Sequence, residues 1–383
     1  MQRTAHRRFT VRTVAAATIA TGLALGTGLT ASSGATRPKV RPITATAAYE
    51  IAHAGQLPTK AFCGTKKITL GIEDGFGINA WSQASMAAVR SEAAKCKNVK
   101  QLVQIAGGSL QTAISQINSM VAQGANAIVV IPDFGQSELP AITAATKAGV
   151  KVVPWAANPG GKAPQDYVSY VDWTPPYSAR LFAQWMVQQL HGHGNIVELG
   201  GPAGNPVSAG MLSAVVSVFK KHPGMHLLTG TSNWAVTNWD PATAQQVAAS
   251  LLAKYPTING IISDYGTDAL AALKAFQAAG RKFPAVAVAD ANGLGCLWHK
   301  VHKTMPSFKL VTVSTRNWMG RVAARKAIAA AEGIRDTEPS LYNLTFFENS
   351  AGGRTPQCAP SQPADRYLSD QLTPATIAKY GKA

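Results

Sequence analysis

The sequence predicts an α/β protein built from two doubly wound parallel-sheet lobes, with a ligand cleft between the lobes. Short apolar runs alternate with segments of helical periodicity from Lys67 onward, as in proteins with parallel sheets. The alternation is present twice, and each half has about the length of one α/β domain. The 383 residues, of which 46% are hydrophobic, supply enough apolar side chains for two cores.

The first 35 residues have the three parts of an export signal. A basic start precedes an apolar run over residues 14–29, and small residues at 33–35 mark the expected cleavage site. A retained membrane anchor is the alternative, but the run is short and interrupted by glycines. The Arg7-Arg8 pair leaves Sec and twin-arginine export both open.

We therefore expect an exported protein, periplasmic or on the exterior of the cell envelope. No cysteine lies near the cleavage site, so no lipid-anchor cysteine is expected. Residues 36–64 are rich in Ala, Pro and Thr without a clear period, and they are interpreted as a linker or N-terminal extension.

The chain is strongly basic, with 36 Lys and Arg against 19 Asp and Glu and a formal net charge of +17. Four of the arginines lie in the first twelve residues, and the other basic residues are scattered. No basic helix is interleaved with aromatic residues, so nucleic acid is not expected as a partner. An anionic envelope surface explains the charge equally well.

The first series of elements begins with an apolar strand from Ile68 to Ile72, then a loop, then a helix in which Ala84, Ala87 and Ala88 recur at helical spacing. Further strands are expected at 99–105, 127–132, 150–155 and 167–171, and further helices at 110–123 and 136–148. Ligands bind at the carboxyl ends of strands in open α/β sheets, so the loop at 73–81 is expected to line a site.

A second series begins after Pro175-Pro176, which stop a strand and open a helix that runs to residue 191. Strands are expected at 195–199, 226–230, 260–263 and 285–289, and helices at 207–221, 241–254 and 268–280. A last strand at 309–314 leads into a helix at 317–332. The carboxyl ends of both sheets point into a cleft between the lobes, which is a favoured place for a small ligand.

The four cysteines fit an oxidising compartment and allow three pairings. Cys63 precedes the first strand and Cys96 ends the helix after it, so both should lie at the end of the lobe away from the ligand loop. This favours a Cys63–Cys96 disulfide and leaves Cys296–Cys358 to tie a loop to the C-terminal tail. Four unpaired thiols are the alternative, and a metal site is disfavoured because no CxxC occurs.

Signatures of enzymes are incomplete. Residues 75–80 have the loose form of the dinucleotide fingerprint, but the second strand does not end in the acid that would hold a ribose. Neither a GxxxxGK[ST] phosphate loop nor a GxSxG elbow occurs. The paired histidines, His191 with His193 and His299 with His302, lack nearby carboxylates and are interpreted as exposed helix-end residues. We expect no catalytic residue, no metal site and no cofactor.

Polar and aromatic residues gather in the loops that follow the strands. Aromatic rings pack on the C–H faces of a hydroxyl-rich ligand, while carboxylates, amides and guanidinium groups bind its hydroxyls. The candidate ligand-binding residues are Asp74, Phe76, Asn79, Trp81, Trp155, Asn158, Trp173, Asn205, Trp239, Tyr265, Asp290, Asn292, Ser314 and Arg316, with Asp264 beside Tyr265 in the same loop. For each tryptophan, packing in a core or between lobes is the alternative. Asp240 is better explained as the N-cap of a helix that opens with Pro241.

Three stretches resemble one known family: IEDGFGINAWSQASMAAVRSEA, INSMVAQGANAIVVIP, and INGIISDYGTDALAALKAFQAAGR followed by VAVADANG. From about Lys67 to Glu348 the chain resembles the periplasmic sugar-binding proteins of the ribose-binding type, the solute receptors of ABC importers. The resemblance implies contact with ligand for Asn79, Trp81, Trp239, Tyr265, Asp290 and Ser314, with Arg316 close by.

The chain departs from this family at two places. Many pentose and hexose binders carry an Asp-Arg pair where this sequence has Ala156-Ala157, and an arginine is expected near Ala209. The missing hydroxyl-binding groups disfavour an ordinary aldopentose. A less polar, cyclic or ring-bearing ligand is favoured instead.

The resemblance implies a monomeric, non-enzymatic receptor of an ABC import system. It would bind a carbohydrate-like solute between two closing lobes and deliver it to an ABC permease. The alternatives are a binder of a less polar cyclic or aromatic solute, an exported enzyme that uses the cleft, or a structural protein of the envelope. DNA-binding regulators share the fold, but here the N-terminus has an export signal where those carry a helix-turn-helix.

The resemblance also divides the chain into lobes. The N-terminal lobe is expected at 65–172 and 315–342, and the C-terminal lobe with its tail at 173–314 and 343–383. The hinge would consist of three segments, near Asp172, Thr315 and Tyr342.

Overall fold

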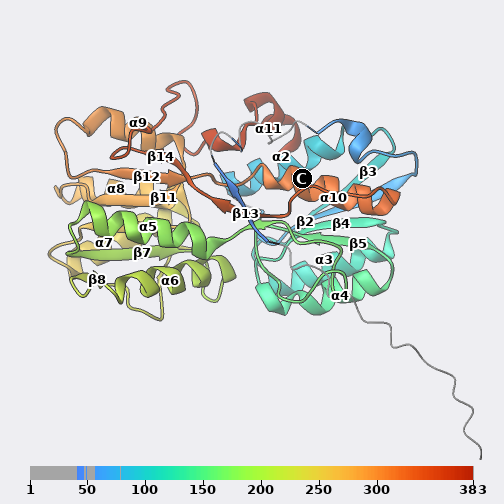
Figure 1. Ribbon diagram of the computed structural model, residues 1–383, viewed down its shortest axis with the longest axis horizontal. Helices are drawn as coiled ribbons and strands as arrows, with labels where there is room; N and C mark the ends of the chain where they lie inside the picture. Colours follow the sequence, from blue (N-terminus) through green and yellow to red (C-terminus); the bar gives the residue numbers. More distant parts are fainter. Residues whose placement is uncertain (1–40, 47–48, 50–56, 78, 383) are drawn as a thin grey trace, which may run out of the picture. The chain divides into compact units, whose positions relative to one another are not determined.

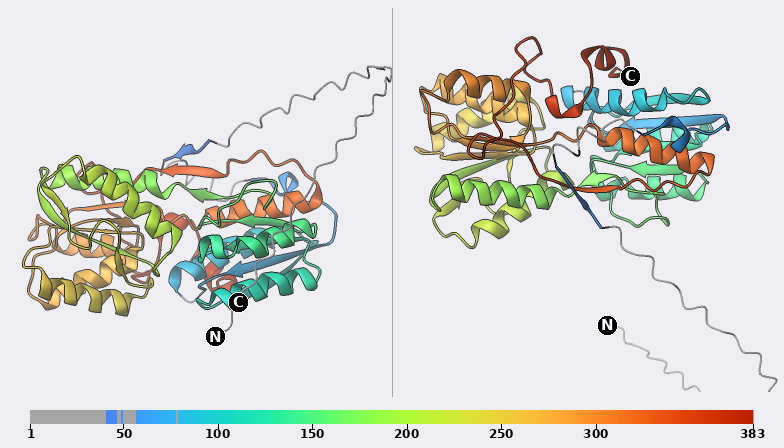
Figure 2. Two further views of the ribbon diagram at one scale, coloured as in Figure 1. Left: turned by 90° about the horizontal axis from the view of Figure 1, so that it is seen from below. Right: turned by 45° about the horizontal axis from the view of Figure 1, so that its top comes forward.

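The computed structural model describes residues 41–46, 49, 57–77 and 79–382. The predicted export signal and part of the predicted linker lie outside these residues. Two sheets follow one another along the chain, each covered by helices on both faces (Figure 1, Figure 2). Among the described residues, no helix combines the length and the apolar character that crossing a bilayer requires.

The first lobe has a four-stranded parallel sheet in the order β3-β2-β4-β5. Its strands are β2 (Ile68–Asp74), β3 (Val99–Ile105), β4 (Ala127–Ile131) and β5 (Lys151–Pro154). Its helices are α2 (Ala80–Ala93), α3 (Leu110–Ala122), α4 (Leu139–Lys147) and α10 (Met319–Glu332). All residues of β4 are buried, as expected for a strand at the centre of a sheet with helices on both sides.

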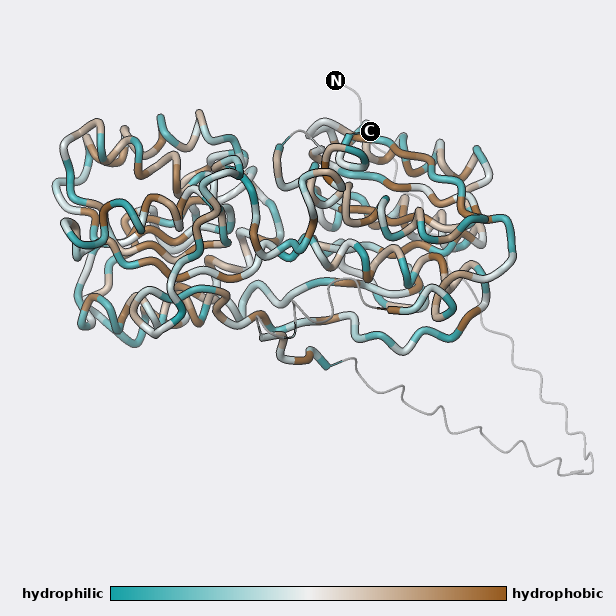
Figure 3. Tube along the Cα trace, turned by 90° about the horizontal axis from the view of Figure 1, so that it is seen from above, coloured by the Kyte–Doolittle hydropathy of each residue, from teal (hydrophilic) through white to brown (hydrophobic). Residues whose placement is uncertain are grey.

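The second lobe has a seven-stranded sheet in the order β14-β12-β11-β10-β7-β8, with β9 beside β7. Its strands are β7 (Gly194–Gly200), β8 (Met225–Leu227), β9 (Ala235–Val236), β10 (Gly260–Ser263), β11 (Ala285–Ala289), β12 (Leu310–Val313) and the antiparallel β14 (Phe346–Asn349). Its helices are α5 (Pro175–Gln189), α6 (Pro206–Phe219), α7 (Pro241–Lys254), α8 (Gly266–Ala278) and α9 (Asn292–Val301). Apolar segments run through the inside of each lobe (Figure 3).

The chain passes between the two sheets at three places. β6 (Asp172–Trp173) leads into α5, β12 leads through Thr315 into α10, and β13 (Leu341–Leu344) leads into β14. β6 and β13 pair with each other and with β1 (Ile43–Ala45) in a small sheet of their own. The lobe boundaries stay a prediction. The C-terminal tail was predicted to go with the second lobe, but its last helix, α11 (Pro374–Tyr380), packs against α2 of the first lobe.

The strand predicted at 167–171 is wrong. Residues 163–166 form a turn after two glycines with positive φ, Gly160 and Gly161. The backbone amides of Val168 and Val171 then donate to the carbonyls of Val152 (2.9 Å) and Pro154 (3.0 Å). The segment therefore runs along β5 without forming a continuous ladder.

The other predicted strands and helices are present, with ends that differ by up to three residues. The helix predicted from residue 136 is split into a short 3-10 turn, Gly135–Ser137, and α4. Helix α9 was not predicted, because Gly293 and Gly295 weaken the helical pattern in a segment of only 10 residues.

Both predicted disulfides are confirmed. Cys63–Cys96 joins the segment before β2 to the turn after α2. Cys296–Cys358 joins α9 to the segment after β14. The chain between β14 and α11 is thereby fixed at the side of the second lobe.

Candidate ligand-binding site

A cavity lies where the loops of the two lobes meet. It is lined by Phe76, Asn79, Trp81, Ser82, Ile131, Asp133, Ala156, Val207, Trp239, Asp264, Tyr265 and Arg316. Seven of these were named from the sequence: Phe76, Asn79, Trp81, Trp239, Tyr265 and Arg316, with Asp264 beside Tyr265. The free volume is about 30 Å³, which is room for about one water molecule.

The first wall is built at the start of α2. Asn79 is the N-cap of this helix, and its side-chain oxygen accepts a hydrogen bond from the backbone amide of Ser82 (2.9 Å). Two residues further, the indole nitrogen of Trp81 donates to the carbonyl of Thr315 (2.8 Å). The ring of Trp81 stacks on the buried Trp155 at 5.8 Å. Trp155 therefore supports the wall from behind and does not line the cavity.

Arg316 brings a positive charge to the cavity. It has a positive φ of 61°, and its guanidinium lies 5.1 Å from the ring of Trp81 and 4.7 Å from the ring of Trp173. Burial lowers the pKa of Arg316, while the nearby carboxylates of Asp172 and Asp264 raise it. Its Nε has no hydrogen-bond partner among the described residues. The guanidinium is thus held by aromatic rings and retains donors for an acceptor in the cavity.

The second wall is built from the loops after β9 and β10. Asp264 accepts a hydrogen bond from the indole nitrogen of Trp239 (3.0 Å) and another from the hydroxyl of Ser208. Burial raises the pKa of Asp264, and these two hydrogen bonds oppose the shift. The ring of Trp239 meets that of Phe76 edge-on, with centroids 5.5 Å apart. This aromatic pair is a direct contact between the lobes.

Asp133 is a cavity residue that the sequence analysis missed. Burial, followed by the carboxylates of Asp74 and Glu138, raises the pKa of Asp133 well above its usual value. The signal that could have found it is an acid directly after the proline that ends a predicted strand, at the carboxyl edge of the sheet.

Three buried carboxylates, those of Asp74, Glu73 and Glu138, lie near Asp133 but do not line the cavity. Asp74 accepts hydrogen bonds from the amides of Phe76 (3.0 Å) and Gly77 (2.8 Å), so it shapes the loop. Glu73 is buried, and neither of its oxygens has a partner among the described residues. Burial raises the pKa of Glu73 well above its usual value, and that of Glu138 to about 7. These groups favour the protonated form in the folded protein.

Three predicted residues serve other contacts. Asp290 accepts hydrogen bonds from the amide of Thr315 (3.0 Å) and from the amide (3.1 Å) and hydroxyl (2.5 Å) of Ser369. Asn292 donates to carbonyls of residues 359, 362 and 363 and so holds the C-terminal tail. Ser314 accepts from the amide of Arg316 (3.0 Å). None of the three lines the cavity, because the tail covers the carboxyl ends of β11 and β12.

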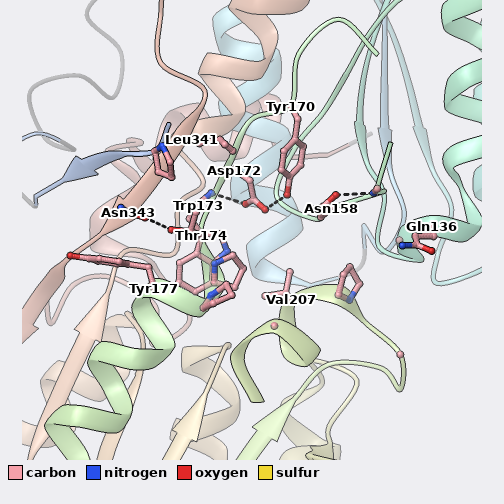
Figure 4. A pocket seen from close by; sticks show the side chains of 18 of the residues that line it. Gln136, Asn158, Tyr170, Asp172, Trp173, Thr174, Tyr177, Val207, Leu341 and Asn343 are labelled. Carbon is pink, nitrogen blue, oxygen red and sulfur yellow. Dashed lines mark hydrogen bonds between the residues drawn. The ribbon is translucent and has the colours of Figure 1, made fainter. Parts of the chain in front are cut away.

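The remaining candidates lie at a larger groove of about 1010 Å³ beside the hinge (Figure 4). Trp173 and Asn158 line this groove, and the carboxylate of Asp172 accepts hydrogen bonds from the amide of Trp173 (2.8 Å) and from the hydroxyl of Tyr170. Asn205 lies at its inner edge, where it caps α6 and donates to the carbonyl of Asp133 (3.1 Å). Asn205 therefore bridges the two lobes.

The arrangement favours binding of a small molecule that carries hydroxyl groups. Aromatic rings form the walls, two acids can accept from hydroxyls, and an arginine can donate to them. Within the part of the chain that the structure describes, no group of three or more His, Cys, Asp or Glu side chains could hold a metal ion.

Two α/β lobes joined by three segments, with a polar and aromatic cavity between them, have the architecture of two-lobed solute-binding proteins. Residues 75–333, more than half of the chain, match the family model of the periplasmic binding protein domain. The chain belongs to this family. The resemblance and the fold class that the sequence predicts are confirmed.

Two curated relatives share part of the chain. A xylitol-binding protein of Mycolicibacterium smegmatis is 28% identical over 189 residues, which are 49% of this chain and 52% of the relative. A D-apiose import binding protein of Paraburkholderia graminis is 27% identical over 168 residues, 43% of this chain and 51% of the relative. The matches thus span about half the length of each relative.

Solved structures share the fold. The arabinose-binding component of an ABC transporter from Shewanella sp. ANA-3 has a TM-score of 0.63 at 19% identity, over 73% of this chain and 92% of that chain. The myo-inositol-binding protein of Caulobacter has a TM-score of 0.64 at 18% identity, over 74% of this chain and 94% of that chain. At these identities the likeness concerns the fold.

Proposed function

We propose that the protein is an exported solute-binding receptor of an ABC import system, and that it binds a sugar or sugar-like polyol between its two lobes. The observation that supports this most is the cavity itself, because both lobes contribute a tryptophan and an acid to it. Family membership and the names of the relatives, which bind xylitol, D-apiose, arabinose and myo-inositol, point the same way.

Binding would use the two walls together. Trp81 and Trp239 would pack on the C–H faces of the ligand, while Asp133 and Asp264 accept from its hydroxyls and Arg316 donates to them. These charged groups would take the place of the Asp-Arg pair that many pentose and hexose binders carry where this chain has Ala156-Ala157. We place the ligand in this cavity and not in the larger groove, because the cavity combines two acids, an arginine and a tryptophan from each lobe. The groove has Arg180 and one acid, Asp172, whose carboxylate already accepts hydrogen bonds from Tyr170 and Trp173.

The ligand would favour the closed arrangement of the lobes. Ligand pockets usually measure about 300–1,000 Å³, and the cavity offers about 30 Å³. The lobes or the lining side chains must therefore move before a ligand enters. Closure around the ligand is driven only by its higher affinity for the closed form, and we propose that an ABC permease recognises that form.

A less polar cyclic solute is the second candidate. Phe76, Ile131 and Val207 line the same cavity and would pack on an apolar ring. Such a ligand would offer no acceptor to the unpaired Nε of Arg316, which is costly in a buried site. The polyol is therefore the better match.

The test begins with ligand released from the purified protein by denaturation and identified by mass spectrometry. Titration with xylitol, D-apiose, L-arabinose and myo-inositol, followed by tryptophan fluorescence, then measures affinity. A saturable change with the ligand recovered unaltered is expected. A chemically altered ligand would indicate an enzyme, and no saturable binding of any polyol would refute the proposal.

A further inference from the structure

One face of the second lobe is formed by the segments at the amino ends of its parallel strands. Strands β7, β8, β10, β11 and β12 all begin there, and the antiparallel β14 ends there. At this face lie the connecting segments together with the adjoining ends of some helices and strands, namely residues 190–194, 220–226, 254–259, 280–284, 299–309 and 350–357. We call this the amino-end face. It lies at the opposite end of these strands from the cavity residues Asp264 and Tyr265, which directly follow β10. Figure 1 shows the course of the strands.

The amino-end face carries cations and no acids. Its six segments contain no Asp or Glu. They contain nine Lys and Arg residues: Lys220, Lys221, Lys254, Arg281, Lys282, Lys300, Lys303, Lys309 and Arg354. Every acid between residues 175 and 314 lies elsewhere: Glu198, Asp264, Asp268 and Asp290 are buried, and Asp240 caps the opposite end of α7.

Helix ends account for only part of this charge. Five helices, α5 to α9, end at the face, and the carboxyl end of a helix carries about half a negative charge. That partial charge offsets about a quarter of the nine cations. In the first lobe, by contrast, three cations form ion pairs with acids: Lys95 with Glu92, Arg325 with Glu92 and Glu338, and Lys326 with Asp336.

Five lysines of the face are exposed and available. Lys220, Lys221, Lys282, Lys300 and Lys303 are solvent-exposed, and their side chains make no hydrogen bond or ion pair with the described residues. They come from three separate segments. A surface of this kind attracts an extended anionic partner.

We propose that the amino-end face binds the anionic headgroups of a lipid bilayer by charge, without insertion. Among the described residues, the one large hydrophobic side chain that counts as exposed is Val236, which lies on β9 and not on this face. The face therefore presents no fully exposed large apolar side chain for insertion. Stacking of nucleic-acid bases is not favoured either, because Trp298 is already covered by His302 at 4.1 Å. If the protein is a receptor for a permease, attachment would keep it near the membrane.

The test uses the mature protein, vesicles of phosphatidylcholine alone, and vesicles of phosphatidylcholine mixed with an equal amount of phosphatidylglycerol. Co-sedimentation is expected only with the mixed vesicles, and it should be lost when salt is raised from about 0.1 M to about 1 M, where the screening length falls to about 3 Å. Each neutralised lysine at the surface should weaken partition about fivefold.

The variant K220Q/K221Q/K282Q/K300Q/K303Q should therefore lose its binding to the mixed vesicles. Its matched control is K60Q/K97Q/K100Q/K147Q/K162Q, which removes the same charge from exposed lysines of the first lobe and of the segment before it. The control should keep most of the binding. Circular dichroism and thermal unfolding check that both variants are folded.

Three results would overturn the proposal. The first is absence of binding to the mixed vesicles at low salt. The second is an equal loss of binding in both variants, since net charge would then suffice. The third is binding of a soluble polyanion such as polyphosphate without binding of vesicles, which would assign the face to another partner. None of these results depends on the identity of the solute.

Discussion

Trp81 and Trp239 approach the cavity from different lobes, and each is held by one hydrogen bond from its indole nitrogen. Trp81 donates to the carbonyl of Thr315 (2.8 Å) and Trp239 to the carboxylate of Asp264 (3.0 Å). A ring held in this way loses little conformational entropy when a ligand packs on it. The two rings are therefore expected to contribute much of the affinity.

Replacement of either ring tests this expectation. Trp81→Ala and Trp239→Ala should each weaken solute binding by about 1–3 kcal/mol, because apolar contact area is lost. Isothermal titration calorimetry measures the change. The control is Trp298→Ala, whose ring stacks on His302 away from the cavity and should leave affinity unchanged. Wild-type affinity in both cavity variants would contradict the role of the rings.

Substitutions at Asp290 and Asp133 are expected to affect different quantities, the first the stability of the fold and the second the binding of solute. Asp290 accepts three hydrogen bonds from Thr315 and Ser369, so Asp290→Ala should lower the free energy of unfolding by about 3 kcal/mol, since buried donors lose their acceptor. Asp133→Ala should instead weaken solute binding. Urea unfolding and calorimetry measure the two quantities. If Asp290→Ala abolished binding at unchanged stability, the assignment of Asp290 to the tail would be wrong.

At the scale of elements, the carboxyl end of β2 and the start of α4 bring buried acids together under the first wall. Neither carboxylate oxygen of Glu73 has a hydrogen-bond partner among the described residues, and one oxygen of Glu138 also lacks a partner there. The other oxygen of Glu138 accepts from the amide of Phe134 (2.9 Å). Acids in this setting favour the protonated form in the folded protein.

The pH dependence of stability follows from this shift. The pKa of Glu138 is raised to about 7, so the folded state binds its proton more tightly than the unfolded state does. Its contribution to stability is complete below about pH 4.5 and is lost as the pH rises to about 7. Between about pH 4.5 and pH 7.5 the free energy of unfolding should therefore fall by up to about 3 kcal/mol less in Glu138→Gln than in the wild type. Urea unfolding at pH 4.5, 6 and 7.5 measures it, and an unchanged slope would contradict the shift.

Most elements were predictable because their periodicity is local. Strands such as β10 and helices such as α7 begin and end where the sequence alone predicts. The segment 167–171 looks like a strand, but its amides find carbonyls of β5 at only two places. Composition predicts that a segment can be extended, and the neighbouring strand decides whether it forms a ladder.

At the scale of the whole molecule, two contacts between the lobes stand out. The edge-on pair of Phe76 and Trp239 is one, and the hydrogen bond from Asn205 to the carbonyl of Asp133 (3.1 Å) is the other. Both form only when the lobes are close. Loss of either contact should shift the population toward an open arrangement.

Asn205→Asp tests this shift without removing the helix cap. The carboxylate can still cap α6, but it can no longer donate to the backbone carbonyl of Asp133, so two acceptors would face each other there. An increased radius of gyration in X-ray scattering and weaker solute binding are expected. Asp240→Asn, which keeps the cap of α7, is the control. Equal scattering curves for Asn205→Asp and the control would contradict a role of Asn205 in closure.

The sequence by itself determined the α/β class, the repetition of the sheet, both disulfide pairings and the loops from which the cavity is built. These features depend on local pattern, on strand ends and on the order of elements. Only the tertiary structure decided which loop residues reach the cavity. Asp290 and Asn292 hold a tail that returns about 70 residues later in the chain, whereas Asp133 takes a place at the cavity. The physical reason is that a polar side chain bonds to whatever partner the fold brings near, and contacts over such a separation leave no local pattern in the sequence.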